Sequence, residues 1–362
     1  MKKLFFFNYW YAFVLSVFSI QMFAQPITTP NAASPAAKVS QTIGISTIDI
    51  SYSRPSVKGR KIWGDLVPYG WNAQGFGNGK KAPWRAGANE NTTITFSHDA
   101  KVEGQPVPAG TYGLFFVINE NNTGEVILSK DHQSWGSFFY EEKRDQLRSK
   151  ITIRDVAHSE HLTYDFINFN KNATELVLNW EKKQFPVKIE FAVDDIVLAN
   201  ATEELKGPVG FTWQGYKTAA EYALQNKVQY DQALVWIDKA ITQNRSFSTL
   251  NVKAKLLTAK GNTTDADKIM KEAVEKANEA ELNTYGYQLL GMEKMDEAIE
   301  ALLLNAKRNP NSANCWDSLG EAYAKKGDKK NAIASFKKSL NLNPTQAVKV
   351  NSEANLKKLG VM

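Results

Sequence analysis

The chain has 362 residues, of which 43% are hydrophobic and 23% charged, and this balance excludes a mainly disordered or collagen-like protein. The formal net charge of +6 is small for this length and gives no reason to expect nucleic-acid binding, which normally shows as a concentrated basic face. Cys315 is the only cysteine, so an intrachain disulfide and a cysteine metal cluster are both excluded.

The N-terminus has the pattern of a targeting segment. Lys2 and Lys3 precede an apolar run that begins at Leu4, and the small residue Ala24 closes the segment. This order predicts a secretory signal peptide at residues 1–24, with no membrane span after its cleavage. The alternative is an uncleaved anchor, because the run is long enough to cross a hydrocarbon core of about 30 Å. Residues 25–40 are rich in Pro, Ala, Ser and Thr and predict a flexible linker.

Apolar and polar residues alternate from Gln41 onward. Alternation with period two places one set of side chains on a core face and predicts β-strands. The expected strands lie around Ile43 and Ile48 and in seven further short runs at residues 92–97, 112–118, 125–130, 151–156, 163–169, 174–181 and 185–193. Short strands separated by turn formers predict an antiparallel β-sandwich or a jelly-roll-like domain over residues 41–200.

One long segment, residues 55–90, interrupts this pattern. It is rich in glycine and aromatic residues, and a loop of this length is uncommon unless it packs on itself or serves a site. From Arg54 to Arg85, seven basic residues are accompanied by a single acid, Asp65. The basic residues fit either a solvated loop or a site for an anionic or polar ligand. The aromatics, including Trp71 and Trp84, suit either stacking against a sugar ring or anchoring of the loop.

Three runs in this part of the chain resemble the signatures of a bacterial family, "domain of unknown function 2911". They are YSRPSVKGR at 52–60, WRAGANE at 84–90 and PAGTYGL at 108–114. The resemblance covers about residues 38–193 and implies an exported protein of a Gram-negative bacterium, in the periplasm or at the cell surface. It lends no established activity. It directs attention to polar residues that, with the two tryptophans, make up the predicted ligand site: Arg54, Arg60, Trp71, Trp84, Arg85, Asn89 and Glu90.

This chain departs from the family pattern by an insert-like stretch at residues 72–81, which puts the shape of a loop-lined pocket in question.

No complete catalytic set is visible in the sequence. His158 and His161 would point to opposite faces of an extended segment, so we expect no metal site there, and no cofactor is implied. The pair Asp131-His132 could orient a base, yet no nucleophile motif accompanies it. Glu90 is the one catalytic candidate, because paired carboxylates of a glycosidase meet in space and not in sequence.

A repeat of close to 34 residues follows Pro208. Its last unit fits the tetratricopeptide template at Trp316, Leu319, Gly320, Tyr323, Ala332, Phe336 and Pro344, and similar residues recur 34 places earlier at Leu282, Tyr285, Gly286, Leu289, Ala298, Leu302 and Pro310. Small residues at these positions let antiparallel helices approach closely. Residues 208–362 are therefore predicted to form an α-helical solenoid of about four helix pairs plus a capping helix.

The template places five residues on the concave groove: Asn283, Tyr287, Asp317, Glu321 and Lys325. In related grooves Lys and Asn hold the carboxylate of a peptide terminus, but here Asp317 and Glu321 would repel it. We therefore expect a protein partner that is not recognised by a free carboxylate. The alternative is a rigid spacer, or a packing partner for the β domain.

The sequence thus favours a non-enzymatic exported scaffold, in which the repeats dock a protein and the β domain binds a polar ligand such as a glycan. The alternative is a carbohydrate-active or other hydrolase that uses carboxylates of the 54–90 region.

Overall fold

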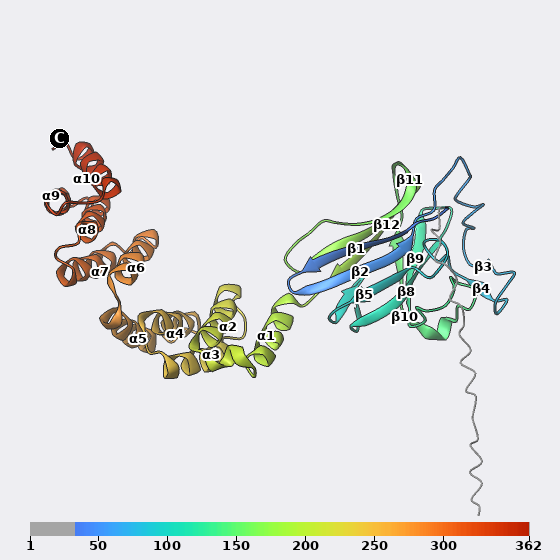
Figure 1. The fold of residues 1–362 in the computed structure, drawn as a ribbon, viewed down its shortest axis with the longest axis horizontal. Coiled ribbons are helices and arrows are strands. Elements are labelled where there is room, and N and C mark those ends of the chain that lie inside the picture. Colours follow the sequence, from blue (N-terminus) through green and yellow to red (C-terminus); the bar gives the residue numbers. More distant parts are fainter. Residues whose placement is uncertain (1–32, 362) are drawn as a thin grey trace, which may run out of the picture.

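The computed structural model describes residues 33–361, so the predicted signal peptide at residues 1–24 and the first part of the predicted linker lie outside it. The described chain has two parts (Figure 1): a β domain, and a curved arm of helices that leads away from it.

The β domain is built from antiparallel strands that form two main sheets and a small hairpin. The larger sheet has six strands in the order β1-β2-β5-β8-β9-β10, the smaller has the order β11-β12-β6-β7, and β3 pairs with β4. The strands are β1 (Ala36–Ile43), β2 (Ser46–Ser53), β3 (Asn72–Ala73), β4 (Lys81–Ala82), β5 (Thr93–Phe96), β6 (Ala100–Val102), β7 (Gln105–Val107), β8 (Gly110–Ile118), β9 (Thr123–Ser129), β10 (Asp145–Thr152), β11 (Arg154–Ile167) and β12 (Ala173–Glu190).

The buried side chains of the two sheets meet in one hydrophobic core. Ile50 and Phe96 of the larger sheet belong to the same cluster as Trp180 and Ile189 of the smaller one. The predicted antiparallel β fold is confirmed, and the two-layer arrangement is that of a sandwich. The strands of the larger sheet lie in sequence order, although the chain forms the β3–β4 hairpin between β2 and β5 and visits the smaller sheet through β6 and β7 between β5 and β8.

The N-terminal edge differs from the expectation for residues 25–40. Strand β1 begins at Ala36, inside the predicted linker, and pairs with β2 from Ala36 opposite Ser53 to Ile43 opposite Ser46. Only Ile43 of this strand is buried. An edge strand with so few buried side chains is held by its backbone hydrogen bonds, which leave no apolar pattern in the sequence.

Two strand assignments in the second half of the domain are also corrected. The run predicted at 151–156 is divided between β10 and β11, and the runs at 174–181 and 185–193 belong largely to the single 18-residue strand β12. Glu181 has a φ of +53°, and the register shifts on both sides of its pair with Ser159. The bulge lets the strand continue where the alternation of the sequence breaks.

Ten α-helices follow in the described chain. They are α1 (Val193–Glu204), α2 (Trp213–Asn226), α3 (Tyr230–Gln243), α4 (Phe247–Ala259), α5 (Thr263–Lys276), α6 (Glu279–Gly291), α7 (Met295–Arg308), α8 (Ala313–Lys326), α9 (Lys329–Leu340) and α10 (Gln346–Lys358). The short 3-10 helices are η1 (Glu142–Arg144) and η2 (Pro208–Phe211). Residue 200, the predicted end of the β domain, falls inside α1.

Helix α1 joins the two parts through both of their cores. Val193 at its start belongs to the core of the β domain, whereas Leu198 belongs to the first core of the helical arm. The carboxylate of Asp194 accepts hydrogen bonds from Lys171 Nζ at 2.7 Å and from Tyr222 OH at 2.8 Å. The junction therefore links the β11–β12 turn, α1 and α2.

Helices α2 to α9 form four successive antiparallel pairs, and α10 packs on α8 and α9. Small residues let the two helices of a pair approach each other closely. A Cβ atom on Gly286 would lie 2.5 Å from Leu302 Cγ, and one on Gly320 would lie 2.8 Å from Phe336 Cδ1. The predicted helical-repeat fold is confirmed, together with the steric reason for its glycines.

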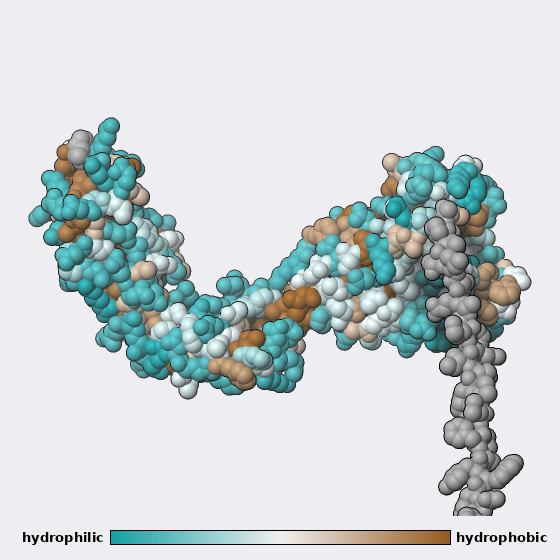
Figure 2. Space-filling view, viewed as in Figure 1, coloured by the Kyte–Doolittle hydropathy of each residue, from teal (hydrophilic) through white to brown (hydrophobic). Residues whose placement is uncertain are grey.

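The surface of the arm is mostly hydrophilic on the face seen in Figure 2, and hydrophobic colour gathers near its junction with the β domain. In η2, Phe211 is 79% exposed. Within residues 33–361 every helix is too short or too polar to cross a membrane.

Candidate functional site

A short loop beside strand β8, residues 85–91, carries three of the seven predicted ligand residues, Arg85, Asn89 and Glu90, and directly follows a fourth, Trp84. Trp84 N donates to Phe116 O at 2.8 Å, and Phe116 N donates to Trp84 O at 3.0 Å. After the loop, Leu114 N donates to Thr92 O at 2.8 Å. Strand β8 therefore holds the chain on both sides of residues 85–91, and this pairing fixes where the loop leaves the sheet.

The loop is also held from within. Buried Ala86 has a φ of +53°, and its carbonyl oxygen accepts hydrogen bonds from Tyr164 OH at 2.9 Å and Thr92 Oγ1 at 3.1 Å. Burial raises the pKa of Tyr164 well above its usual value, so the phenol remains a hydrogen-bond donor at neutral pH. A left-handed backbone at a non-glycine residue persists only where the surroundings enforce it.

Beside this loop lies a cavity of about 530 Å³. It gathers four of the seven predicted ligand residues, Arg60, Trp84, Arg85 and Asn89. Further lining residues come from the 55–58 segment, the hairpin β3–β4, the 136–138 segment and β12, and they include Ser56, Lys58, Asn72, Gln74, Ser137 and Trp180. The insert-like stretch at 72–81 is thus the hairpin that walls one side of the cavity.

Tryptophans form the inner wall. Trp84 stacks on Trp180 with 5.8 Å between ring centroids and 15° between planes, and Trp63 meets both rings edge-on. Trp63 is 7% exposed, so it anchors the loop, whereas half-buried Trp84 lines the cavity. Anchoring of the loop therefore accounts for Trp63, and Trp84 is the tryptophan that lies at the cavity. The buried Nε1 atoms of Trp63 and Trp180 have no acceptor among residues 33–361.

Arg85 is the most constrained cation of the cavity. Its Nη1 donates to Asn89 O at 2.6 Å, and its Cζ lies 5.0 Å from the centroid of the Phe138 ring. Gly136, with a φ of +60°, lies against the guanidinium, because a Cβ atom there would be 2.3 Å from Arg85 Cζ. Burial lowers the pKa of Arg85 from its usual value. A guanidinium in such a place favours an anionic neighbour.

The remaining predicted residues lie elsewhere. Arg54 Nε donates to Leu162 O at 3.1 Å. Trp71 lines a separate hollow, where Arg148 Cζ lies 4.8 Å from its ring centroid. Glu90 is exposed and lines a third hollow with Lys38. The described lining of the main cavity contains no Asp or Glu, so this cavity offers no carboxylate pair for a hydrolase.

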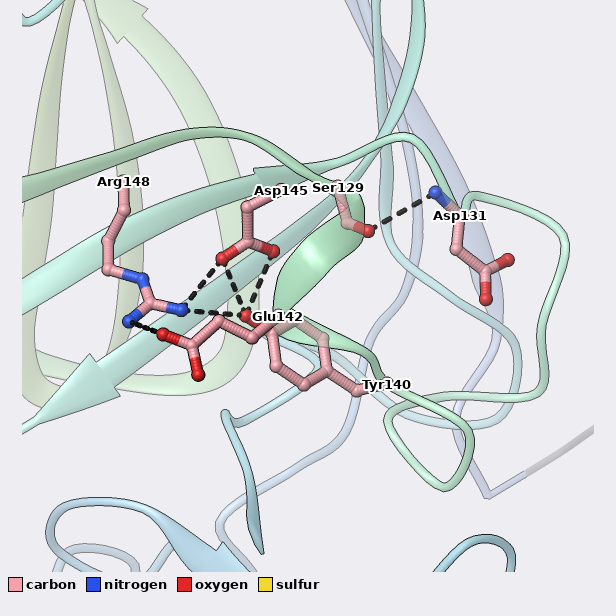
Figure 3. Close-up of polar contacts among 6 residues, drawn as sticks. All are labelled: Ser129, Asp131, Tyr140, Glu142, Asp145 and Arg148. Atoms are coloured by element: carbon pink, nitrogen blue, oxygen red, sulfur yellow. Dashed lines mark hydrogen bonds and ion pairs between the residues drawn. The ribbon is translucent and has the colours of Figure 1, made fainter. Parts of the chain in front are cut away.

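Figure 3 shows a polar network around Asp145 and Arg148 that the sequence did not reveal. Tyr140 OH donates to both carboxylate oxygens of Asp145, at 2.7 and 2.9 Å. Arg148 donates to Asp145 Oδ2 at 2.8 Å and to Glu142 Oε1 at 2.9 Å. Burial is the main cause that raises the pKa of Tyr140. The network orients Arg148 over Trp71, and only the spacing of Asp145 and Arg148 could have hinted at it.

Two of the histidines form hydrogen bonds within and next to β11. His158 and His161 lie in β11, where His161 Nδ1 is 2.9 Å from Ser56 Oγ and His158 Nε2 is 3.4 Å from Glu160 Oε2. The Asp131 carboxylate accepts a hydrogen bond from Ser134 Oγ at 2.6 Å. Within residues 33–361, no three His, Cys, Asp or Glu residues converge as metal ligands.

Most of the predicted groove residues of the helical arm lie close together, but side chains of α10 already form hydrogen bonds with two of them, Asp317 and Glu321. Asn351 Nδ2 donates to Asp317 Oδ2 at 2.7 Å and to Glu321 Oε1 at 2.6 Å, and Ser352 Oγ donates to Asp317 Oδ1. Tyr287 OH donates to Glu321 Oε2 at 2.6 Å. Burial raises the pKa of Asp317 above its usual value.

The other two groove candidates lie beside this cluster. Lys325 Nζ donates to Leu290 O at 2.8 Å, whereas the buried Oδ1 of Asn283 has no hydrogen-bond donor among the described residues.

The open part of the groove lies nearer the β domain. A hollow of about 320 Å³ there is lined by residues of α2, α4 and α6, including Lys217, Glu221, Asn251, Thr284 and Gln288. Asn251 resembles Asn283, because its buried Oδ1 also has no donor in the described chain. The sequence analysis missed these residues, although the repeat spacing from Asn283 back to Asn251 could have found them.

Comparison with known families agrees with this two-part structure. Residues 34–189 match the family described as "Protein of unknown function (DUF2911)", and residues 313–346 match the tetratricopeptide repeat (TPR). The chain carries a DUF2911 domain followed by a TPR region. The resemblance stated from the sequence is confirmed, with bounds of 34–189 in place of about 38–193.

Three similar solved structures each have low sequence identity to this chain. YrrB, "a TPR protein with an unusual peptide-binding site", is 17% identical over 44% of this chain and 84% of that chain, with a TM-score of 0.28. PilF of Pseudomonas aeruginosa is 23% identical over 42% and 71%, with a TM-score of 0.29. The C-terminal part of a TPR protein from Cytophaga hutchinsonii is 17% identical over 47% and 78%, with a TM-score of 0.30. No curated protein matches this chain.

Two of the three DUF2911-like runs converge on the main cavity. The run at 84–90 supplies Trp84, Arg85 and Asn89, and the run at 52–60 supplies Lys58 and Arg60 among others. The third run, 108–114, lies in and before β8, which carries the loop. The DUF2911 domain therefore places part of two of these runs around one concave site, and the helical arm places polar residues along a groove.

Proposed function

We propose that this protein is a non-enzymatic, exported scaffold of the bacterial envelope, in which the TPR region docks a protein partner and the DUF2911 domain binds a polar ligand such as a glycan. Tetratricopeptide repeats indicate protein–protein interaction, because stacked helix pairs create an extended concave binding surface. The observation that carries the proposal is the presence of two separate concave sites, one in each part of the chain.

The groove between α2, α4 and α6 supports the docking of a partner. The buried amide oxygen of Asn251 in its lining, and that of Asn283 on α6 outside the lining, have no hydrogen-bond donors in the described chain. An unsatisfied buried acceptor costs about 1–3 kcal/mol. Backbone N–H groups of an extended peptide would supply these donors. The C-terminal part of the groove suits a partner less well, because Asn351 and Ser352 of α10 already bond its acidic residues.

The main cavity supports the binding of a polar ligand. Its volume of about 530 Å³ lies within the range of roughly 300–1,000 Å³ that is usual for small-molecule sites. A tryptophan wall with amide and hydroxyl groups around it suits a ligand that has one flat apolar face and many hydrogen-bonding groups.

The docking proposal is tested by affinity capture from a bacterial envelope extract with the full mature chain. A double variant, Lys217→Ala with Asn251→Ala, removes two groove residues, and Lys271→Ala on helix α5 is the matched lysine control. A partner should be retained by the wild type and the control and lost by the double variant. Equal retention by all three proteins would contradict docking in this groove.

Two further experiments test the export of the protein and the absence of enzymatic turnover of a bound glycan. The mature chain isolated from a periplasmic or surface fraction should begin at Gln25 by intact mass. A glycan array followed by a turnover assay should show binding without hydrolysis. Hydrolysis that disappears in Glu90→Gln would instead support the carbohydrate-active alternative.

A further inference from the structure

We propose that the main cavity of the DUF2911 domain recognises a sugar-like ring that carries a carboxylate, and that Arg85 binds this carboxylate. The inference rests on the proposed ligand-binding function and narrows it from a polar ligand to an acidic one. It is drawn from three features of the cavity: its charge, the placement of Arg85, and the groups that remain for the rest of the ligand.

The charged residues that line the cavity are all basic. Lys58, Arg60 and Arg85 line it, and no acidic residue is present in its described lining. Concave sites lined by charges of one sign concentrate the field and attract counter-ions. Arg60 bonds only backbone carbonyls in the described chain, those of Ser56 and Val57. A carboxylate nearby is that of Glu160, which accepts a hydrogen bond from the backbone N of Lys58 at 2.9 Å and is not part of the cavity lining.

Arg85 is placed as a receptor for a planar anion. Its side chain is fixed by the Phe138 ring and the Gly136 backbone, and one of its five N–H donors is used by Asn89 O. The guanidinium fork matches a carboxylate through two parallel hydrogen bonds. Because the side chain is already ordered, the bound geometry requires little additional loss of conformational entropy.

The rest of the cavity is too large and too varied for a bare inorganic anion. Half-buried Trp84 offers an aromatic surface for the apolar face of a ring. The amide side chains of Asn72 and Gln74 lie on the hairpin side, and amides both donate to and accept from ligand hydroxyls. A pyranose ring with a carboxylate combines all of these requirements in one small molecule.

The test compares an acidic with a matched neutral sugar on the full mature chain. Binding of a galacturonic acid disaccharide, the corresponding galactose disaccharide and inorganic phosphate is measured by calorimetry at two salt concentrations. We expect the acidic disaccharide to bind at least about tenfold more tightly than the neutral one, with an affinity that falls as salt screens the charges. Phosphate alone should bind weakly.

Variants assign the effect to Arg85. Arg85→Gln should lower the affinity for the acidic disaccharide at least about tenfold and leave the neutral one almost unchanged. Arg85→Lys keeps the charge but not the fork and should show an intermediate loss. Lys61→Gln, an exposed cation outside the cavity lining, is the matched control and should bind like the wild type. If Arg85→Gln does not fold, exposed Arg60→Gln replaces it.

The outcomes separate this inference from the broader function. Equal affinity for the acidic and neutral disaccharides would overturn the role of charge and leave the ligand-binding function standing. Phosphate binding as tight as that of the acidic sugar would overturn the requirement for a ring. Binding of none of the three ligands would overturn the acidic-sugar inference, and a glycan array without any hit would then count against the ligand-binding function as well.

Discussion

The two parts of this molecule are stabilised in different ways. The DUF2911 domain has one main core that extends through both sheets from Ile43 to Val193. The interior of the TPR region is instead divided into successive clusters, around Trp236, Leu302 and Phe336. A defect in a shared core should weaken the entire domain, whereas a defect in one cluster of a repeat array should remain near its own repeat.

The largest effect is expected at the centre of the β core. Trp180 is 1% exposed and contacts both Trp63 and Trp84, so Trp180→Ala should destabilise the DUF2911 domain by about 3–5 kcal/mol. Urea unfolding measures the loss in free energy of unfolding, and native-state hydrogen exchange shows where in the chain it occurs. Amides of both sheets should lose protection while those of α8 and α9 keep theirs. Equal loss in the distant helices would contradict the separation of the two parts.

A smaller and more local effect is expected in the array. Gly286→Ala places a Cβ atom 2.5 Å from Leu302 Cγ, and such overpacking costs about 1–3 kcal/mol. Gly291→Ala at the end of the same helix is the matched control, because its Cβ would meet nothing within 4 Å. The control should be neutral or slightly stabilising. In Gly286→Ala the exchange of α6 and α7 amides should accelerate, and an equal acceleration throughout the sheets would refute local behaviour.

The contact of α10 with the groove predicts a pH effect of unusual sign. Because burial raises the pKa of Asp317 in the folded state, the folded protein binds this proton more readily than the unfolded chain does. The contribution of Asp317 to stability should therefore increase as pH falls from neutrality through its folded pKa. Asp317→Asn should remove this dependence, and urea midpoints of variant and wild type between pH 4 and 7 measure the difference.

The matched variant Asp317→Ala separates charge from hydrogen bonding. It leaves Ser352 Oγ and Asn351 Nδ2 without their acceptor and should cost about 1–3 kcal/mol, with loss of protection in α10. Asp317→Asn should be no less stable than the wild type at pH 7, because an amide can both accept and donate here. If the two variants were equally unstable, the carboxylate charge itself would be required.

The smallest effect is expected at the junction and has the opposite sign. The hydrogen bond from Lys171 is the main cause that lowers the pKa of Asp194, so its contribution is present above the unfolded pKa and is lost as pH falls through the folded pKa. Asp194→Asn should cost less than about 1 kcal/mol, because Lys171 is partly exposed. Small-angle scattering of Asp194→Asn should show a wider range of orientations between the β domain and the helical arm than scattering of the control variant Glu203→Gln. The control removes only the exposed ion pair between Glu203 of α1 and Lys206.

The helical part could be predicted from the sequence because its contacts recur at a fixed spacing. Gly286 and Leu302, like Gly320 and Phe336, are paired by the repeat itself. The occupation of the groove by α10 was missed, although Asn351 follows Asp317 by 34 residues and therefore takes the equivalent position on the next helix.

The sequence predicted the antiparallel sandwich of the β domain but not its strand order or its side-chain contacts, since these contacts join residues far apart in the chain. Glu90 follows Asn89 directly, yet the left-handed φ of +60° at Asn89 turns the chain, and the two residues line different hollows. Arg54 lies in a family-like run, but its guanidinium bonds Leu162 O, 108 residues away. No local pattern in the sequence predicts such pairings, so the sequence could nominate candidate ligand residues but could not predict which of them share a cavity.

Helix α1 connects the β domain and the helical arm through contacts with both cores. With Val193 in one core and Leu198 in the next, α1 has no free turn at which the arm could swing. Its twelve residues set a span of about 18 Å along the axis. Under the proposed function, a ligand in the main cavity and a protein in the groove would therefore be joined through a short helix that is packed into both cores, so that binding of either molecule brings it to the carrier of the other.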